Sequence, residues 1–172
     1  MATHNGVTVP YPLLIKKTKN NGTSTAVINT AVTYDMVVSE VPFKFCGDVK
    51  EPYSNDWKDE DGTEEYLPDE GLKLQGYEMD VTFLYVGTYD SFKGKLRTFL
   101  TYLLGKDNNG SRLTIYDTYT NVGRQDVRVK KIDPDVFIKQ PTSGGGQEIA
   151  RFKITFYVGD PMTDITLTID NS

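Results

Sequence analysis

Few residues in this sequence have the types and spacing that side-chain catalysis requires. The only histidine is His4, in a polar N-terminal stretch, so Ser-His-Asp and Cys-His catalysis and zinc sites with two or more histidines are excluded. The single cysteine, Cys46, follows the strand-like pattern of Phe43 and Phe45, and we expect a packed or partly buried thiol rather than a nucleophile. The sequence therefore predicts a protein that is not an enzyme.

The stretch 47–70 is acidic enough to require a test for calcium binding. It contains ten Asp or Glu residues and two Lys residues. A calcium loop needs an acid five residues before its central glycine and another six residues after it. With Gly62 as that glycine, these positions hold Trp57 and Pro68, so the pattern fails. We expect no metal ion and interpret the stretch as a solvated, interface-forming loop.

The glycine-rich segments do not fit phosphate binding either. Residues 144–146 are glycines that lead into a strand pattern rather than the start of a helix, and Gly105-Lys106 stands before its loop instead of after it. Pairs of carboxylates carry little information among 24 Asp and Glu residues, because some pairs must arise by chance. We therefore expect no cofactor.

Length and composition indicate one compact domain over residues 1–172. The apolar content of 38% can supply a core at this length. The net charge of −5 argues against nucleic acid or an anionic membrane surface as the main partner. The sequence has no apolar run of about 18 residues that could span a bilayer. Because MATHNGVTVP lacks the apolar part of a signal peptide, we expect synthesis in a cytoplasm, which the single cysteine fits.

One stretch, about 90–104, has the spacing of an amphipathic helix. We expect Asp90 or Ser91 to cap its start through a side-chain oxygen and Gly105 to end it in the left-handed conformation. We expect its apolar face to be core and to cover an open end or face of a sheet. The apolar positions are Phe92, Leu96, Phe99, Leu100, Leu103 and Leu104.

Most of the remaining chain alternates with a period of two, which is typical of strands. This pattern predicts a mainly β (α+β) fold, an antiparallel β-sandwich or half-barrel with one flanking helix. Residues 1–10 are expected to be flexible, and 162–172 to form a C-terminal strand or tail. The predicted strands are Tyr11–Lys16, Thr25–Phe45, Leu72–Val86 with a bulge at Gly76, the hairpin Leu113–Ile132, Val136–Lys139 and Glu148–Val158, with a flexible loop over Pro141–Gln147.

The acidic stretch 47–70 is long for a connection within a compact domain, and we predict a protruding arm. As an extended hairpin of about 12 residues per side, it would reach roughly 40 Å from the body. It contains Tyr53, Trp57 and Tyr66, which a purely solvating segment would not need.

Basic residues gather on and beyond the second-half hairpin, at Arg124, Arg128, Lys130, Lys131 and Lys139. They form either a patch for an acidic surface or the solvated face of a ribbon. Between subunits, such a patch and the acidic arm would suit head-to-tail, ring-forming contacts. The predicted interface residues are Asp48, Tyr53, Trp57, Asp59, Asp61, Tyr66, Arg124, Arg128 and Lys130.

The order of elements from Gly71 to Pro161 resembles a known family pattern. A strand is followed by an amphipathic helix with spaced leucines, a polar turn, a hairpin and the closing strand RFKITFYVGDP, which ends in Asp160-Pro161. This order resembles the tail-tube fold of bacteriophage tail-tube, distal tail and baseplate-hub proteins. The resemblance implies a β-sandwich or half-barrel with one helix, assembled into a ring, commonly of six subunits, around a channel that is often acidic. Distal tail proteins often have a second, C-terminal domain, and this sequence ends soon after Pro161.

The resemblance implies a structural subunit of a phage tail or phage-like injection device. Its partners would be copies of itself and other tail or baseplate proteins, with DNA only as cargo in the channel, in a virion or prophage-derived particle. A tube subunit and a small baseplate ring protein are equally good assignments. The alternative is a non-catalytic, carbohydrate-binding β-sandwich module that uses Tyr53, Trp57 and Tyr66 as a stacking platform. Burial of these aromatics against another subunit would favour assembly, and an exposed concave platform on a monomer would favour binding.

Overall fold

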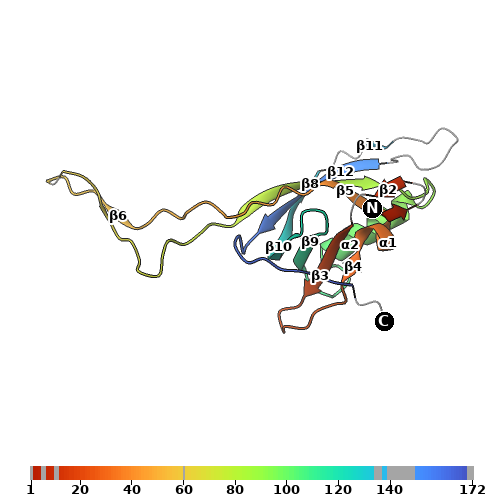
Figure 1. Cartoon of the computed structure of the whole chain (residues 1–172), viewed down its shortest axis with the longest axis horizontal. Helices are drawn as coiled ribbons and strands as arrows, with labels where there is room; N and C mark the ends of the chain where they lie inside the picture. Colours follow the sequence, from red (N-terminus) through yellow and green to blue (C-terminus); the bar gives the residue numbers. More distant parts are fainter. Residues whose placement is uncertain are drawn as a thin grey trace.

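The computed structural model describes residues 2–4, 7–9, 12–59, 61–133, 137–138 and 150–169. Within these ranges it consists of a curled antiparallel sheet, two helices and a long two-stranded arm (Figure 1). The mainly β class that the sequence predicts is confirmed, and the sheet has the shape of a half-barrel.

The central sheet has the strand order β4-β3-β9-β10-β12-β8-β5, with every neighbouring pair antiparallel. A short strand, β11, pairs with the start of β12 and continues the row begun by β10. Two further pairs, β1 with β2 and β6 with β7, lie outside this sheet. The strands are β1 Ala2–His4, β2 Val7–Val9, β3 Leu13–Thr18, β4 Ile28–Asn29, β5 Met36–Glu40, β6 Ser54–Asn55, β7 Glu64–Glu65, β8 Tyr77–Tyr85, β9 Arg112–Asp117, β10 Val122–Ile132, β11 Phe137–Ile138 and β12 Ala150–Val158.

A short helix, α1 (Thr30–Tyr34), joins the two edge strands β4 and β5. Because its five residues span the gap between the edges, the sheet has to curl. The Asn29 side chain caps α1 by accepting from the N–H groups of Ala31 and Val32 at 2.9 and 3.2 Å. The expectation of one helix, and of strand throughout Thr25–Phe45, is therefore wrong.

The strands β8 and β12 form the wall of the core, as their alternation predicts. Each has every second side chain buried from its first residue to its last, and the residues between them are exposed or partly so. However, β8 begins at Tyr77 rather than Leu72, and Gly76 is not at a bulge. A Cβ atom on Gly76 would lie 2.4 Å from the Tyr157 hydroxyl oxygen, so this glycine permits a close approach between neighbouring chain segments.

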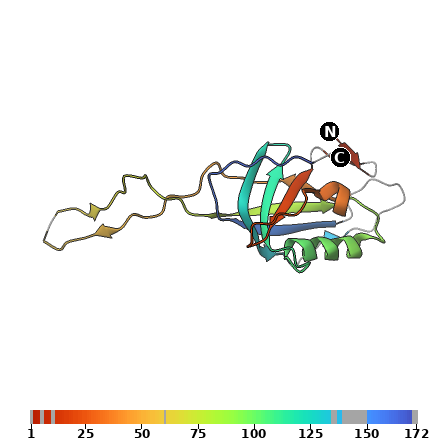
Figure 2. The ribbon, with the colours of Figure 1, turned by 90° about the horizontal axis from the view of Figure 1, so that it is seen from below.

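The predicted amphipathic helix is α2 (Phe92–Leu103), and it covers the open side of the curled sheet (Figure 2). Its central residue, Phe99, packs against Phe83 of β8 and Tyr34 of α1, with ring centroids 5.2 Å apart in both pairs. The core role of the predicted apolar face is confirmed at five positions. Phe92, Phe99 and Leu103 are buried, and Leu96 and Leu100 pack partly buried against the core.

Three details of α2 differ from or refine the prediction. Leu104 is 38% exposed, and Tyr102 is buried in its place. The N-cap residue Ser91 makes no side-chain capping hydrogen bond, so the predicted side-chain cap is wrong. Gly105 has φ +71°, which confirms the left-handed end.

The segment after β12 runs across the outer side of the sheet, and its described residues form no strand, so of the predicted strand or tail it is the tail. Leu167 is buried and clusters with Leu14 of β3 and Tyr116 of β9. The Ile165 N–H donates to the Gly123 carbonyl at 3.3 Å, and a Cβ atom on Gly123 would lie 2.0 Å from the Ile165 carbonyl oxygen. The C-terminal segment is therefore held to the sheet by a backbone contact between Ile165 and Gly123 and not by the ladder of hydrogen bonds that a strand would make.

The predicted loop Pro141–Gln147 and parts of the N-terminal stretch and of the strand Val136–Lys139 lie outside the described residues. Within the described ranges, no helix has the length and apolar character needed to cross a membrane.

Candidate assembly surfaces

The acidic arm leaves the body as two antiparallel segments next to the start of β8. The Gln75 N–H donates to the Asp48 carbonyl at 2.7 Å, and the Lys50 N–H donates to the Lys73 carbonyl at 2.8 Å. A Cβ atom on Gly47 would lie 1.9 Å from the Gln75 carbonyl oxygen, so only glycine fits where the outgoing segment crosses the returning one. Figures 1 and 2 both show the arm projecting away from the sheet, as predicted.

Arg124 of β10 fixes the base of the arm from inside the protein. Its side chain is 1% exposed and forms an ion pair with Asp164 of the C-terminal segment. Its Nη2 donates to the Lys44 carbonyl and its Nη1 to the Gly123 carbonyl, both at 2.9 Å. The prediction placed Arg124 on a contact surface, and the structure corrects it to an internal anchor between the sheet, the arm base and the C-terminal segment.

The two sides of the arm differ in length between its base and its outer part. The next backbone hydrogen bond beyond Lys50 and Lys73 runs from the Tyr66 N–H to the Tyr53 carbonyl, at 2.9 Å. Two residues separate these points on the outgoing side and six on the returning side. The extra residues form a turn closed by a 3.0 Å hydrogen bond from the Gly71 N–H to the Pro68 carbonyl. The arm therefore bends at this turn instead of continuing as one ladder.

The outer part of the arm has an aromatic face. Its register pairs Ser54 with Glu65 and Asn55 with Glu64, and continuing it places Tyr53 opposite Tyr66. Because side chains alternate along a strand, positions 53, 55 and 57 share one face with 64 and 66. Two side-chain hydrogen bonds agree with this arrangement: the Tyr53 hydroxyl donates to Asn55 Oδ1 at 3.2 Å, and Trp57 Nε1 donates to Glu64 Oε2 at 3.3 Å.

These aromatic side chains are open to solvent. Tyr53 is 73% exposed, Trp57 53% and Tyr66 69%. Asp48, Asp59 and Asp61, the predicted acidic interface residues, are exposed as well. A two-stranded ribbon by itself is only marginally stable in water. Exposed aromatic side chains on such a ribbon are typical of an interaction surface.

The basic residues of β10 lie on a face that supplies its own counter-charges. The Arg128 guanidinium sits 4.9 Å from the centre of the Tyr157 ring, and Lys130 forms an ion pair with Glu78 of β8. One row further along, Lys153 pairs with Asp80 at 3.2 Å. This arrangement favours the solvated face of a sheet over a free basic patch. Lys139, at the end of the predicted patch, lies outside the described residues.

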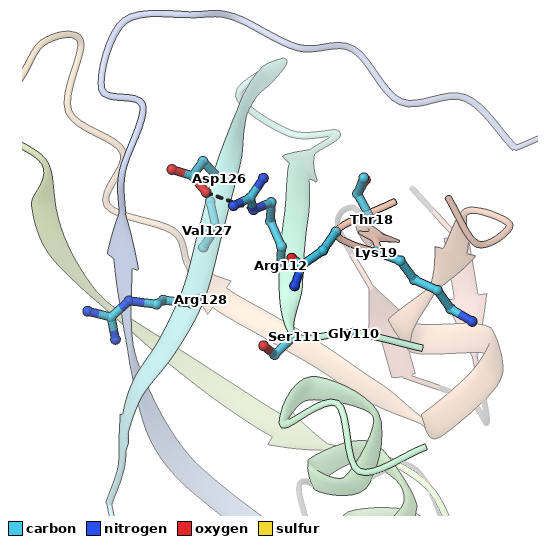
Figure 3. A pocket seen from close by; sticks show the side chains of 9 residues that line it. Thr18, Lys19, Gly110, Ser111, Arg112, Asp126, Val127 and Arg128 are labelled. Atoms are coloured by element: carbon cyan, nitrogen blue, oxygen red, sulfur yellow. Dashed lines mark ion pairs between the residues drawn. The ribbon is translucent and has the colours of Figure 1, made fainter. Parts of the chain in front are cut away.

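A polar hollow of about 550 Å³ opens beside the basic hairpin (Figure 3). It is lined by residues 18–20, 110–112 and 126–128. Arg112 is already paired with Asp126 at 3.2 Å, and Figure 3 shows Lys19 and Arg128 pointing away from each other. Its charged groups therefore do not converge on one point. In the described part of the chain, no cluster of three His, Cys, Asp or Glu side chains could hold a metal ion.

Cys46 is exposed, so the prediction of a packed thiol is wrong. Strand β5 ends at Glu40, and a tight turn follows in which the Phe43 N–H donates to the Val41 carbonyl. Phe43 and Phe45 therefore do not belong to a strand, although their spacing of two residues suggested one. Phe45 is 87% exposed. Sequence reasoning also missed Asn55 and Glu64 on the aromatic face, although the period-two spacing of Tyr53 and Trp57 indicates that Asn55 lies between them.

No family model matches the sequence, and no curated protein matches it. Among solved structures, the chain is similar to the Dit (gp 19.1) protein of SPP1, described as a paradigm of the hub adsorption apparatus in Gram-positive infecting phages. The identity is 15% and the TM-score 0.48. The match covers 88% of this chain and 50% of the other, so this chain spans about half the length of its neighbour.

Proposed function

We propose that this chain is a non-enzymatic structural subunit of a phage tail or phage-like injection device, and that it assembles with copies of itself into a ring or tube around a channel. Its other partners are tail or baseplate proteins, and DNA passes only as cargo. It belongs in a virion or a prophage-derived particle.

The observation that carries this proposal is the arm. Its aromatic residues Tyr53, Trp57 and Tyr66 share one face of a ribbon that projects away from the body and leaves them exposed. Projecting aromatic surface of this kind is costly in a chain that acts alone and is typical of a contact made in an assembly. The half-barrel with one covering helix agrees with what the tail-tube resemblance implies.

The test is the assembly state of the purified full-length chain. We expect sedimentation velocity to show association that grows with concentration and negative-stain electron microscopy to show closed rings or stacked tubes. The matched control replaces residues 51–72 with a short Gly-Ser linker between Lys50 and Lys73, which faces it across the arm base. This variant should stay folded and monomeric. A wild-type chain that remains monomeric at the highest attainable concentration would contradict the proposal.

Carbohydrate binding is the second candidate, because three exposed aromatics on one face also suit stacking against sugar rings. A glycan array with the wild type and the Trp57→Ala variant separates the two functions. Binding to a defined glycan by the monomer, lost in Trp57→Ala, would favour the carbohydrate-binding module. No glycan binding together with assembly would favour the structural subunit.

A further inference from the structure

One flank of α2 carries an apolar ridge of leucines that the core covers only in part. Leu96, Leu100 and Leu104 follow one another at four-residue spacing, so they stand in line along one side of the helix. The first two are partly buried and the third is 38% exposed. They line a shallow, mainly apolar depression that Thr101 completes.

Cationic side chains border this ridge. Lys93, Arg97 and Lys106 line the same depression and are exposed. None of them appears in an ion pair between described residues, whereas Lys130 and Lys153 on the sheet are paired with acids of β8. The ridge therefore keeps a positive border, whereas two of the lysines on the sheet face already have acids as partners.

We propose that this α2 ridge is the docking site for the acidic arm of a second copy of the chain. The inference rests on the proposed function and names the surface that receives the arm. It differs from the sequence-based interpretation, which paired the arm with the basic hairpin.

The arm matches the ridge in both kinds of chemistry. Its aromatic face, with Tyr53, Trp57 and Tyr66, can cover the leucines, and its carboxylates can lie against the cations on either side. The tip between the two outer strands contains Asp59 and Asp61, which are exposed. The hollow of Figure 3 offers the arm less, because its lining is mainly polar and Arg112 already has Asp126 as its counter-ion.

Geometry makes the contact intermolecular. In both Figure 1 and Figure 2 the arm leaves the body at the end away from α2, so the arm does not lie on its own ridge. A contact between two different patches is heterologous, and its repetition gives a ring if it closes and a filament if it does not. Either outcome fits a ring or tube subunit.

Site-specific photo-crosslinking tests the contact directly. Trp57→p-benzoylphenylalanine places the probe on the aromatic face of the arm, where the native side chain is 53% exposed. After irradiation of a mixture of ¹⁵N-labelled and unlabelled chains, we expect cross-links between copies at residues 93–106. Cross-links between copies that map to residues 18–20 or 110–112, or to β10, would overturn the inference.

Charge reversal tests the electrostatic part. The double variant Lys93→Glu/Arg97→Glu should weaken association by roughly tenfold or more, because like charges would then face each other. Adding Asp59→Lys and Asp61→Lys should restore much of the affinity. The matched control is Lys19→Glu, an exposed cation in the hollow of Figure 3, which should change association less than about twofold.

The failures of the two proposals can be told apart. If the chain forms rings or tubes and the α2 variants assemble as well as the wild type, the α2 docking site is wrong and the structural function stands. If the wild type does not associate at any concentration, both fall. Circular dichroism of every variant should match the wild type, because the changed side chains are exposed.

Discussion

At the residue scale, the least expected feature of the core is a buried lysine. The Lys17 side chain is 0% exposed, forms an ion pair with Asp107 at 2.6 Å and lies 4.0 Å from the centre of the Tyr102 ring. Asp107 follows the end of α2, so the pair joins the loop after the helix to β3. Burial raises the pKa of Tyr102 to about 12, which keeps this neighbour neutral at ordinary pH. Asp107 is then the counter-ion that makes a buried Lys17 tolerable.

Asp107→Asn should destabilise the fold by about 3 kcal/mol, because it leaves a buried lysine without its counter-ion. The double variant Lys17→Met/Asp107→Asn should recover much of this loss, since it removes the buried charge as well. Urea unfolding of the wild type, Lys17→Met, Asp107→Asn and the double variant measures the coupling free energy between Lys17 and Asp107. The control is Glu70→Gln in the exposed Lys73–Glu70 pair, with an expected change below about 0.5 kcal/mol. If Asp107→Asn destabilises the fold no more than Glu70→Gln does, Asp107 is not the counter-ion that stabilises the buried Lys17.

The same pair predicts a dependence of stability on pH. Burial alone would raise the pKa of Asp107, but hydrogen bonds from Lys17 and Asn109 outweigh it and lower the pKa below the ordinary 3.8. A carboxyl with a lowered folded-state pKa stabilises the fold above its unfolded value, and that stability is lost as the pH falls through the folded value. The free energy of unfolding of the wild type should therefore fall on acidification below about pH 4 more steeply than that of Asp107→Asn. Parallel curves for the two proteins would contradict this assignment.

Arg124→Lys should loosen the arm without unfolding the body. A lysine cannot reproduce the guanidinium contacts to the Lys44 carbonyl and Asp164, and hydrogen bonds to charged groups contribute about 1.5–3 kcal/mol each. Hydrogen–deuterium exchange should quicken at residues 44–50 and 163–167 and stay unchanged in β8. Arg128→Lys serves as control, because Arg128 is exposed and lies over Tyr157. Equal effects of the two substitutions would rule out the anchoring role.

At the element scale, the sequence predicted the long strands that meet the core and missed the short pairs outside the central sheet, β1 with β2 and β6 with β7. The alternation in β8 and β12 was legible because one side of each strand meets the core along its whole length. Helix α1 was hidden because its sequence TAVTY is rich in β-branched residues, and the signal that marks it is Asn29 as cap rather than any periodicity. Cys46 was misplaced because alternation was read past the end of β5.

The arm was predicted from its length and charge, but the α2 ridge that we propose as its docking site was not. The spacing of the leucines in α2 predicts that all of them are buried in the core. It does not indicate that Leu104 is exposed to solvent and that Tyr102 is buried instead. Ion pairs across strands, such as Lys130 with Glu78, depend on a register that only the fold supplies. The sequence therefore locates the charged residues but does not indicate which of them form ion pairs in the folded protein.

Two glycine substitutions should have opposite effects on stability. Gly94 lies inside α2 with open space where a Cβ atom would stand, so Gly94→Ala should stabilise the fold by about 0.5–1 kcal/mol. Gly123→Ala should destabilise it, because its Cβ atom would lie 2.0 Å from the Ile165 carbonyl oxygen and the C-terminal segment would have to move. Chemical unfolding of both variants measures the difference, and effects of equal sign would contradict this reading of the packing.

At the scale of the whole molecule, body and arm differ in what stabilises them. The main core cluster draws on the half-barrel strands and both helices and contains none of the described residues between 44 and 76. The outer arm has a two-residue strand on each side, and its side chains are mostly exposed. The stabilities of the body and of the arm should therefore be independent. The body should be stabilised by its core, and the arm by the partner that binds it.

Limited proteolysis with a glutamate-specific protease tests this independence. In the unassembled chain we expect the first cuts within 51–70, where Glu51, Glu64, Glu65 and Glu70 are exposed. The nicked body should melt within about 2–4 °C of the intact protein, because the core contacts are untouched. In the assembled protein, cuts near the aromatic face should slow and those in the body should not. A large fall in melting temperature after nicking would show that the arm stabilises the body, and equal cutting rates before and after assembly would show that the arm does not make the contact between copies.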